Sequence, residues 1–468
     1  MEIAFFIYEF DEHNNTINFV DWKASVKENV RKLLYFRVGL PGESGGYANL
    51  RNSLILTGIP MTIKNLIITT LIFLLWGCKK GEPGKPVIPQ KPIGERLFNL
   101  GDTTGGSEVY GISKTPDNNI IISGTKELFN NSVGYVSYYP QRIVLDHSSL
   151  EVLSAAAPLA NIYGNAVQSR QSGDFIYTLI TLADPSGNPI NQVEVIKTDT
   201  SKKIIWQKTF NGITTATSLE LLSDGNLLIE GNYGSDATGS TNSMVLLLMD
   251  PNGNSIFNKQ YTGQFSSSSF DVLEEGTNFT SVAFSLASSS VYLNILKPSL
   301  LKIDFSGNVI SSSPFDNFFP GGIWHYFTSF HLTKKIQGGY ILTSTFVDTA
   351  GGAVDENFYL KFLNPDGSVS KSANLWIDGT PVFRVADVLQ TQNGNVYALV
   401  CLDTGTDFAT EIIEYDSQGN YLNSAGISMD RYPMGLVEAE NNNIIVIQDY
   451  AAANSISVMK LNLNLRVL

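Results

Sequence analysis

The chain has 468 residues, and 31 Lys and Arg against 44 Asp and Glu give it a formal net charge of −13. Hydrophobic residues make up 43% and charged residues only 16%, which excludes intrinsic disorder for most of the length because a core can form. The acidic balance argues against a nucleic-acid partner, since phosphate binding needs clustered Lys and Arg. Two cysteines provide neither a disulfide framework nor a Cys-built zinc site.

Residues 61–78, MTIKNLIITTLIFLLWGC, have the parts of a secretory signal. A single Lys64 precedes an apolar run of eleven residues, 66–76, which ends at Gly77 and Cys78. A helix needs about 20 residues to cross the hydrocarbon core of a membrane, so this run is short for a stable span. A positive end, a short apolar middle and a small residue at the cleavage site are typical of a signal peptide.

The segment Leu75-Trp-Gly-Cys78 resembles the lipobox of bacterial lipoproteins. The resemblance implies that the chain is cut before Cys78 and that this cysteine carries a diacylglycerol thioether. Trp76 departs from the small residue that is commoner at the middle position. The alternative is a buried apolar strand that ends in a buried cysteine. We therefore expect a signal peptide at 61–77, followed by a Pro-, Gly- and Lys-rich tether at 78–95.

A signal peptide must stand at the N-terminus to be read, so we expect Met61 to be the true start. Residues 1–60 are then an over-extension of the reading frame. The alternative is a genuine small helical segment, because four apolar residues between positions 26 and 34 would share one helix face. With the lipobox, this predicts a protein of the cell envelope, anchored by lipid on Cys78, in the outer membrane of a Gram-negative bacterium. Periplasmic and surface-facing display both remain open.

From residue 96 to residue 468 two phrases recur seven times in the same order. The first is a polar turn followed by a β-forming run, as in DGNLLIEG from Asp224. The second alternates apolar and polar residues and ends in Asp or Asn, as in LLLMD to Asp250. Successive copies of the second phrase are 46 to 60 residues apart. Each unit divides into four strands joined by hairpin signals, and such a repeat predicts a β-propeller blade.

The last unit has three strands and lacks a fourth, whereas a spare strand, RLFNLG at 96–101, precedes the first unit. If that strand completes the last blade, the ring has no open sheet edge. The sequence thus predicts an all-β fold: a seven-bladed β-propeller of four-stranded blades, closed by an N-terminal strand. The repeat resembles those of bacterial propeller lipoproteins with a K-x-D-x-x-G-x-x-x-W-x-K-x-F-x-G consensus, which residues 197–212 match best. That family is functionally mixed, so it supports the fold rather than an activity.

Two regions on one face of the propeller are candidates for ligand binding. The fifth unit begins with the most aromatic stretch of the domain, at 317–331, whose rings could stack on a sugar or a peptide. The links between second and third strands lie on the same face and are long, polar and dissimilar. The alternative is that these rings fold back onto their own blades. The candidate residues are Trp324, His325 and Tyr326 from the aromatic stretch and Tyr135, Tyr138 and Tyr139 from the first link.

We expect no cofactor and no metal site. The Asp-x-x-Gly turns predict carboxylates that cap their own turns rather than calcium loops, and His147 is expected to be solvated. The leading hypothesis is a non-enzymatic binding or scaffold module for protein or glycan. A hydrolase or lyase acting on polysaccharide is the alternative, and an assembly component of an outer-membrane complex is a third reading. The inner-strand carboxylates available to an enzyme are Glu220, Asp271, Glu275 and Asp387.

Overall fold

The structure is a computed structural model, and its contacts divide the chain into two units, residues 1–84 and 85–468. In the first unit, β1 (Phe5–Asp11) and β2 (Thr16–Trp22) form an antiparallel pair. The helical alternative near residue 30, the expected start at Met61 and the lipobox fall outside the described residues. The structure describes residues 5–11, 16–22, 95–99, 107–130, 135–156, 159, 162–234, 243–262, 265–267, 272–286, 296–314, 325–348, 355–374, 376–377, 380–403, 408–429, 431–450, 455–462 and 464–466.

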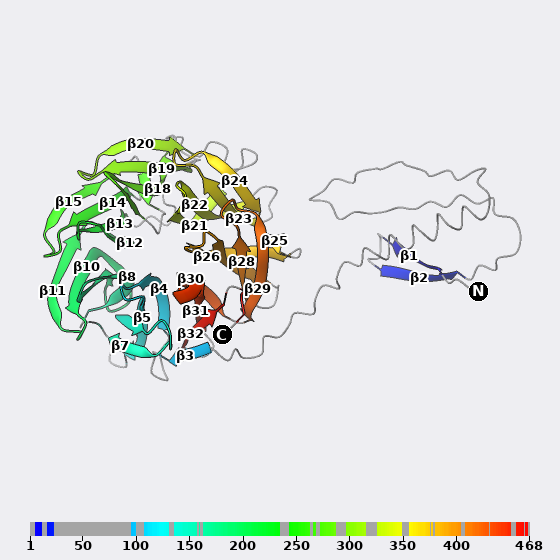
Figure 1. Cartoon of the computed structure of the whole chain (residues 1–468), viewed down its shortest axis with the longest axis horizontal. Coiled ribbons are helices and arrows are strands. Elements are labelled where there is room, and N and C mark those ends of the chain that lie inside the picture. The colour runs from blue at the N-terminus through cyan, green and yellow to red at the C-terminus, as the bar shows by residue number, and fades with distance from the viewer. Residues whose placement is uncertain are drawn as a thin grey trace, which may run out of the picture. The chain divides into compact units, whose positions relative to one another are not determined.

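The described strands of the second unit form seven antiparallel sheets arranged as a ring of blades (Figure 1). Blade 1 consists of β4 (Ser107–Lys114), β5 (Ile120–Asn130), β6 (Tyr135–Leu145) and β7 (Val152–Ala156). Blade 2 consists of β8 (Gly164–Ser172), β9 (Phe175–Ala183), β10 (Pro189–Asp199) and β11 (Ile204–Asn211). Blade 3 consists of β12 (Thr215–Leu221), β13 (Leu227–Tyr233), β14 (Ser243–Met249) and β15 (Ser255–Gln260). Blade 4 consists of β16 (Phe265–Ser267), β17 (Leu273–Glu275), β18 (Asn278–Leu286), β19 (Leu296–Asp304) and β20 (Val309–Pro314). Blade 5 consists of β21 (His325–Lys334), β22 (Tyr340–Asp348), β23 (Asp355–Leu363) and β24 (Val369–Asn374). Blade 6 consists of β25 (Trp376–Ile377), β26 (Thr380–Gln390), β27 (Val396–Asp403), β28 (Phe408–Tyr415) and β29 (Tyr421–Met429).

Blade 7 joins the two ends of the propeller. It consists of β30 (Tyr432–Glu438), β31 (Ile444–Tyr450), β32 (Ser455–Leu461) and β3 (Glu95–Asn99), in the order β3-β32-β31-β30. The N-terminal strand β3 pairs antiparallel with β32, and Leu97 lies opposite Ser457. The predicted closure and the predicted number of seven blades are both confirmed, and β3 covers what would otherwise be an open edge.

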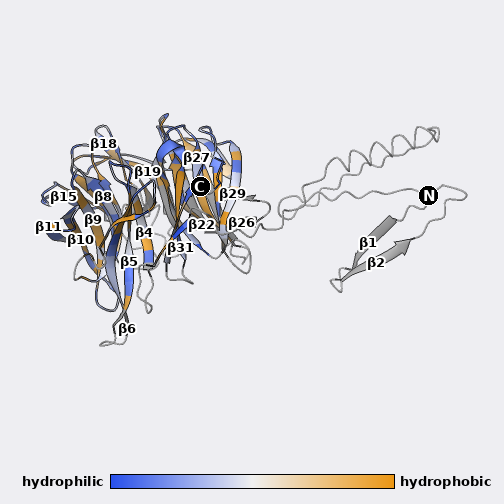
Figure 2. Cartoon of the chain, turned by 60° about the horizontal axis from the view of Figure 1, so that its bottom comes forward, coloured by the Kyte–Doolittle hydropathy of each residue, from blue (hydrophilic) through white to orange (hydrophobic). Residues whose placement is uncertain are grey.

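The core lies between the blades rather than within any one of them. One cluster joins Val195 of blade 2 to Leu247 of blade 3, and another joins Phe362 of blade 5 to Val400 of blade 6. Middle strands are sandwiched between neighbouring blades, so all seven residues of β14 are buried, whereas exposure alternates along the outer strand β11. Figure 2 shows hydrophobic segments along the strands. Complete burial of one such aliphatic side chain stabilises the fold by about 1.5–3 kcal/mol.

One core position breaks the aliphatic pattern. Arg142 of β6 is 2% exposed, and its Nη1 donates a hydrogen bond of 3.2 Å to Thr178 Oγ1 of blade 2. Burial lowers the pKa of Arg142 to about 10. Hydroxyl groups continue the polar contact, since Ser169 lies 2.7 Å from Ser123 and 2.9 Å from Thr178. Arg142 stands four residues before the Asp that ends the third strand of its repeat. At the equivalent position, the six other blades carry an aliphatic residue: Val195, Leu246, Leu300, Leu360, Ile412 and Val458.

We expect Arg142→Leu to raise the free energy of unfolding by about 1–2 kcal/mol, because a buried charge is replaced by the side chain that other blades use. Arg142→Ala should instead lower it by about 2–5 kcal/mol, since it leaves a cavity. Chemical denaturation of both variants measures whether each one raises or lowers the free energy of unfolding. A leucine variant less stable than the wild type would mean that the hydrogen bonds of the guanidinium outweigh its burial.

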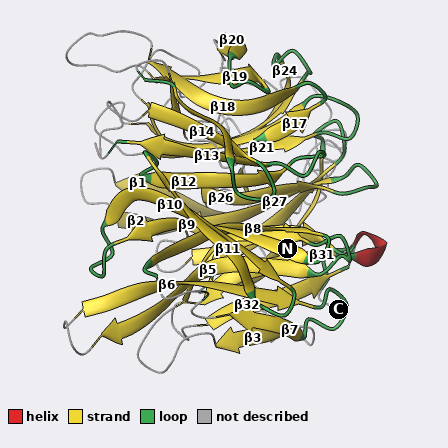
Figure 3. Ribbon diagram, turned by 90° about the vertical axis from the view of Figure 1, so that its left-hand side faces the viewer, coloured by secondary structure: helices red, strands yellow, loops and turns green. Residues whose placement is uncertain are grey.

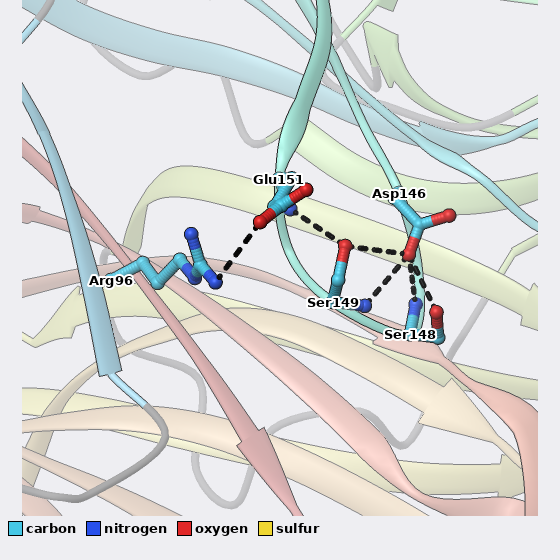
Figure 4. A network of polar contacts seen from close by, with 5 residues as sticks. All are labelled: Arg96, Asp146, Ser148, Ser149 and Glu151. Atoms are coloured by element: carbon cyan, nitrogen blue, oxygen red, sulfur yellow. Dashed lines mark hydrogen bonds and ion pairs between the residues drawn. The ribbon is translucent and has the colours of Figure 1, made fainter.

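The two faces of the propeller are built differently. The turn face carries the hairpins between first and second and between third and fourth strands. In the hairpin after β14, Asp250 Oδ1 accepts the backbone N–H groups of Asn252 and Asn254 at 2.9 and 2.8 Å, and Gly253 takes φ of 81°. These hydrogen bonds lower the pKa of Asp250. In Figure 4, Asp146 likewise accepts hydrogen bonds from two serines of its own turn. The aspartates therefore cap their turns, as the sequence predicted.

Candidate functional site

The opposite face, here called the loop face, carries the links between second and third strands and between blades. Its longest regular feature is the β5–β6 hairpin of blade 1, paired from Ile120 and Leu145 to Asn130 and Tyr135. Each of these strands has 11 residues, against 7 in β13 and β14 of blade 3. Figure 3 shows the β5–β6 hairpin reaching beyond the neighbouring strands. The hairpin thus extends the backbone of blade 1 above the rest of the ring.

Tyr138 and Tyr139 lie on β6 and pack toward blade 2. The Tyr139 ring is tilted by 48° against the ring of Tyr163, with 5.2 Å between centroids. Tyr138 lies over Gly187 in the β9–β10 loop, where an added Cβ would be 2.8 Å from Tyr138 Cε2. Ser137 next to them donates a 3.3 Å hydrogen bond to the Pro185 carbonyl. Both rings are therefore half-buried in an inter-blade contact and leave only part of their surface for a ligand.

The other predicted residues lie in two places on the ring. Tyr135 begins β6 of blade 1, whereas His325 and Tyr326 begin β21 of blade 5 and pair with Asp348 and Val347. Blades 1 and 5 are not neighbours, so the structure does not bring the two groups together. The side chains of these three residues lie outside the described part of the structure, as do Trp324 and Cys78.

A group of ionisable side chains that the sequence did not predict lies where blade 7 meets blade 1, toward the loop face. Glu108 and Tyr110 lie on β4, Glu127 on β5 and Asp449 on β31. The Tyr110 hydroxyl donates a hydrogen bond to Glu108 Oε2. Burial, reinforced by repulsion from Glu108 and Glu127, raises the pKa of Asp449 to about 6. Among the described residues, nothing donates a hydrogen bond to the buried Asp449 Oδ1.

We expect Asp449→Asn to stabilise the protein at pH 8 and to have little effect at pH 4. Because the pKa of Asp449 is raised in the folded state, folding favours the protonated acid. The stability that this provides is complete below the ordinary carboxyl pKa near 4 and is lost as the pH rises through about 6. Partial solvation limits the gain to about 1 kcal/mol at pH 8. Thermal unfolding at both pH values, with the exposed Asp174→Asn as control, measures it. Equal effects at pH 4 and pH 8 would contradict the assignment.

The carboxylates proposed for an enzyme bind neighbouring blades instead of facing one another. Glu220 of blade 3 lies 3.5 Å from the Nη2 atom of Arg170 in blade 2. Glu275 of blade 4 accepts a 2.5 Å hydrogen bond from the Tyr340 hydroxyl of blade 5. Asp387 of blade 6 accepts a backbone N–H of blade 7 at 2.8 Å. These three acids therefore hold the ring together.

The turn face has a polar hollow where blades 6, 7 and 1 meet. Its volume is about 230 Å³, and it is lined by Lys114, Asn118, Gln392, Glu438, Ala439, Glu440, Asn441 and Asn442. His147 lies beside it: its side chain is 15% exposed, and Nε2 lies 2.8 Å from Glu440 Oε1. The prediction that His147 is solvated is therefore wrong, because the first turn of blade 7 covers it. The fourth proposed acid, Asp271, lies outside the described residues.

In the part of the chain that the structure describes, no three side chains of His, Cys, Asp or Glu converge in a way that could hold a metal ion. Within the same residues, no helix has the length and apolar character needed to cross a membrane. The only cysteine they include, Cys401, is buried and unbridged.

No protein family and no curated protein matches this sequence. Among solved structures, the chain is similar to an ulvan lyase at 10% identity and a TM-score of 0.47, covering 79% of this chain and 98% of that one. The chain is also similar to the extracellular domains of Drosophila semaphorin 1a, at 11% identity and a TM-score of 0.46, covering 80% of this chain and 89% of that one. For the propeller domain of the Trilobed protease from Pyrococcus furiosus, the identity is 11% and the TM-score is 0.43, covering 79% of this chain and 94% of that one. Such distant likeness carries no functional argument. By its own strand order, the chain is a seven-bladed β-propeller closed by its N-terminal strand.

Proposed function

We propose that the chain is an exported protein, anchored by lipid on Cys78, whose propeller is a binding or scaffold module for protein or glycan. The observation that carries the binding role is the difference between the two faces. The turn face repeats one tight turn, as at Asp250 and Asp304. The loop face carries links of four to nine residues between second and third strands on the same rigid sheets, and the β5–β6 hairpin has the longest paired strands. Rigid sheets that carry divergent loops suit recognition.

The chemistry of blades 7 and 1 at the loop face agrees with a polar partner. Glu108, Glu127 and Asp449 supply acceptors, and the partly exposed Tyr110 and Tyr139 supply rings and hydroxyls. Such groups hydrogen-bond to the hydroxyls of a glycan or to the basic side chains of a protein. Glu220, Glu275 and Asp387, by contrast, are engaged between blades, which supports a binding role over catalysis.

The anchor is tested by the fate of Cys78. We expect the wild-type chain, produced in a Gram-negative host, to sediment with membranes and to need detergent for release. Cys78→Ser should be recovered in the aqueous fraction, because the acyl chains that hold the protein are never attached. The matched control is Cys401→Ser, whose thiol is buried in blade 6 and should not affect retention. Membrane retention of Cys78→Ser equal to that of the wild type would refute the anchor.

Binding is tested with the detergent-solubilised full chain on a glycan array and in pull-down experiments from envelope proteins. We expect Glu127→Gln with Tyr139→Ala, both on the β5–β6 hairpin, to reduce binding of any ligand found by about tenfold or more. Asn252→Ala on the turn face is the matched control and should leave binding unchanged. A ligand lost with the turn-face variant alone would place recognition on the opposite face.

A further inference from the structure

The direction of the closing strand shows on which face the chain enters the propeller. In the third strand of blade 7, Ser455 lies at the loop face and Leu461 ends at the turn face, where Leu465 N donates a 2.9 Å hydrogen bond to Asn462 O. Since β3 is antiparallel to β32, it runs from Glu95, opposite Met459, to Asn99, opposite Ser455. The chain therefore arrives from the turn-face side and proceeds toward the loop face.

The first residue of β3 is held firmly in the propeller. The Glu95 side chain is completely buried and forms an ion pair with Arg431, which precedes β30. Ser457 of β32 donates a 2.8 Å hydrogen bond to the same carboxylate oxygen. These contacts link the arriving chain to both the inner and the third strand of blade 7, so its point of arrival is fixed.

Chain length limits how far this point can lie from the lipid. Sixteen residues separate Cys78 from Glu95, so the fully extended path is at most roughly 60 Å. The β5 and β6 strands of 11 residues rise about 36 Å at roughly 3.3 Å per residue. To turn the loop face onto the membrane, the tether would have to double back at Glu95 and run along the outer wall of the propeller, about 13 Å to the level of Ser455 on blade 7 and then further past the β5–β6 hairpin. Held at the turn face, the chain keeps that length free.

We infer that the anchor holds the turn face toward the membrane and presents the loop face away from it. The partner recognised by the loop face is then a macromolecule on the side away from the anchoring bilayer, and not the lipid surface of that bilayer. This inference rests on the proposed lipid anchor and adds a direction to it. Acidic and tyrosine side chains around Glu108, Tyr110 and Asp449 face that partner, whereas the turn-face carboxylates face the lipid headgroups.

The experiment places one fluorophore on each face of the lipidated full chain in vesicles that contain a headgroup-quencher lipid. Asn252→Cys labels the turn face between β14 and β15, and Ser186→Cys labels the loop face between β9 and β10; both positions are exposed, whereas Cys401 is buried. We expect quenching at position 252 to be at least twice that at position 186.

The outcomes separate the two proposals. Vesicle-bound protein with equal quenching at both positions, or with stronger quenching at 186, overturns the orientation and leaves the anchor standing. Protein that does not bind vesicles overturns both. Inserting twenty Gly and Ser residues before Glu95 should bring the two signals closer together, because the longer tether no longer restricts the propeller. An unchanged difference would mean that something other than tether length sets the orientation, and would overturn the inference.

Discussion

Replacing Glu95 by Gln should lower the free energy of unfolding by about 3–5 kcal/mol, because it removes the carboxylate of a buried ion pair and the guanidinium of Arg431 loses this charged partner. The Glu95 side chain is fully buried and that of Arg431 is 15% exposed. The loss also weakens the attachment of β3, which covers the edge of β32. Urea denaturation of the full chain measures the change.

The neighbouring residue provides a matched control on the same strand. Arg96 lies 3.8 Å from Glu151, and their side chains are 47% and 67% exposed (Figure 4). Exposed pairs contribute at most about 1 kcal/mol, so Arg96→Gln should change stability by less than that. Comparable small losses for Glu95→Gln and Arg96→Gln would show that the buried pair does not secure the closure.

Replacing Gly111 by Ala should destabilise the propeller by about 3 kcal/mol or more. An added Cβ would lie 2.2 Å from the Val167 carbonyl oxygen, where β4 of blade 1 approaches β8 of blade 2. That atom belongs to the backbone of an inner strand, so the two blades would have to separate, and overpacking of this kind is costly. The effect is steric, because Gly111 does not need the left-handed conformation.

Gly426→Ala in β29 is the control for Gly111→Ala. No atom outside the immediate neighbours lies within 4 Å of a Cβ built at Gly426. Alanine there restricts the unfolded chain and should stabilise the protein by about 0.5 kcal/mol. Thermal unfolding of the two variants should therefore shift in opposite directions. Shifts of the same sign and size would contradict the close approach of the two inner strands.

The fold could be predicted from the sequence because each blade repeats the same local signals. Asp250 and its turn recur at similar spacing, and the missing fourth strand of the last unit is matched by the spare strand at 96–101. The structure places that strand at 95–99 and confirms the pairing. Closure follows from counting strands, because an unpaired edge is unfavourable wherever it occurs.

The ionisable groups were harder to predict, because blade packing brings together residues that are distant in sequence. Glu108 and Asp449 lie on the first and the last blade, and no local pattern links them. Tyr138 was predicted as a ligand contact, yet it packs on Gly187 of the next blade. Arg142 did leave a signal: within the aliphatic third strands, RIVLD has a charge where LLLMD has leucine.

The pairing of β3 with β32 has a consequence for the synthesis of the protein. Glu95 and Ser457, which are hydrogen-bonded in the finished ring, are 362 residues apart in the chain. The first strand of the propeller thus leaves the ribosome long before its partner exists, and six blades are complete before the seventh can form. Contacts of such long range form slowly. We expect ring closure to be the last step of folding, completed after the whole chain has been synthesised, and β32 to be the segment most in need of a chaperone until then.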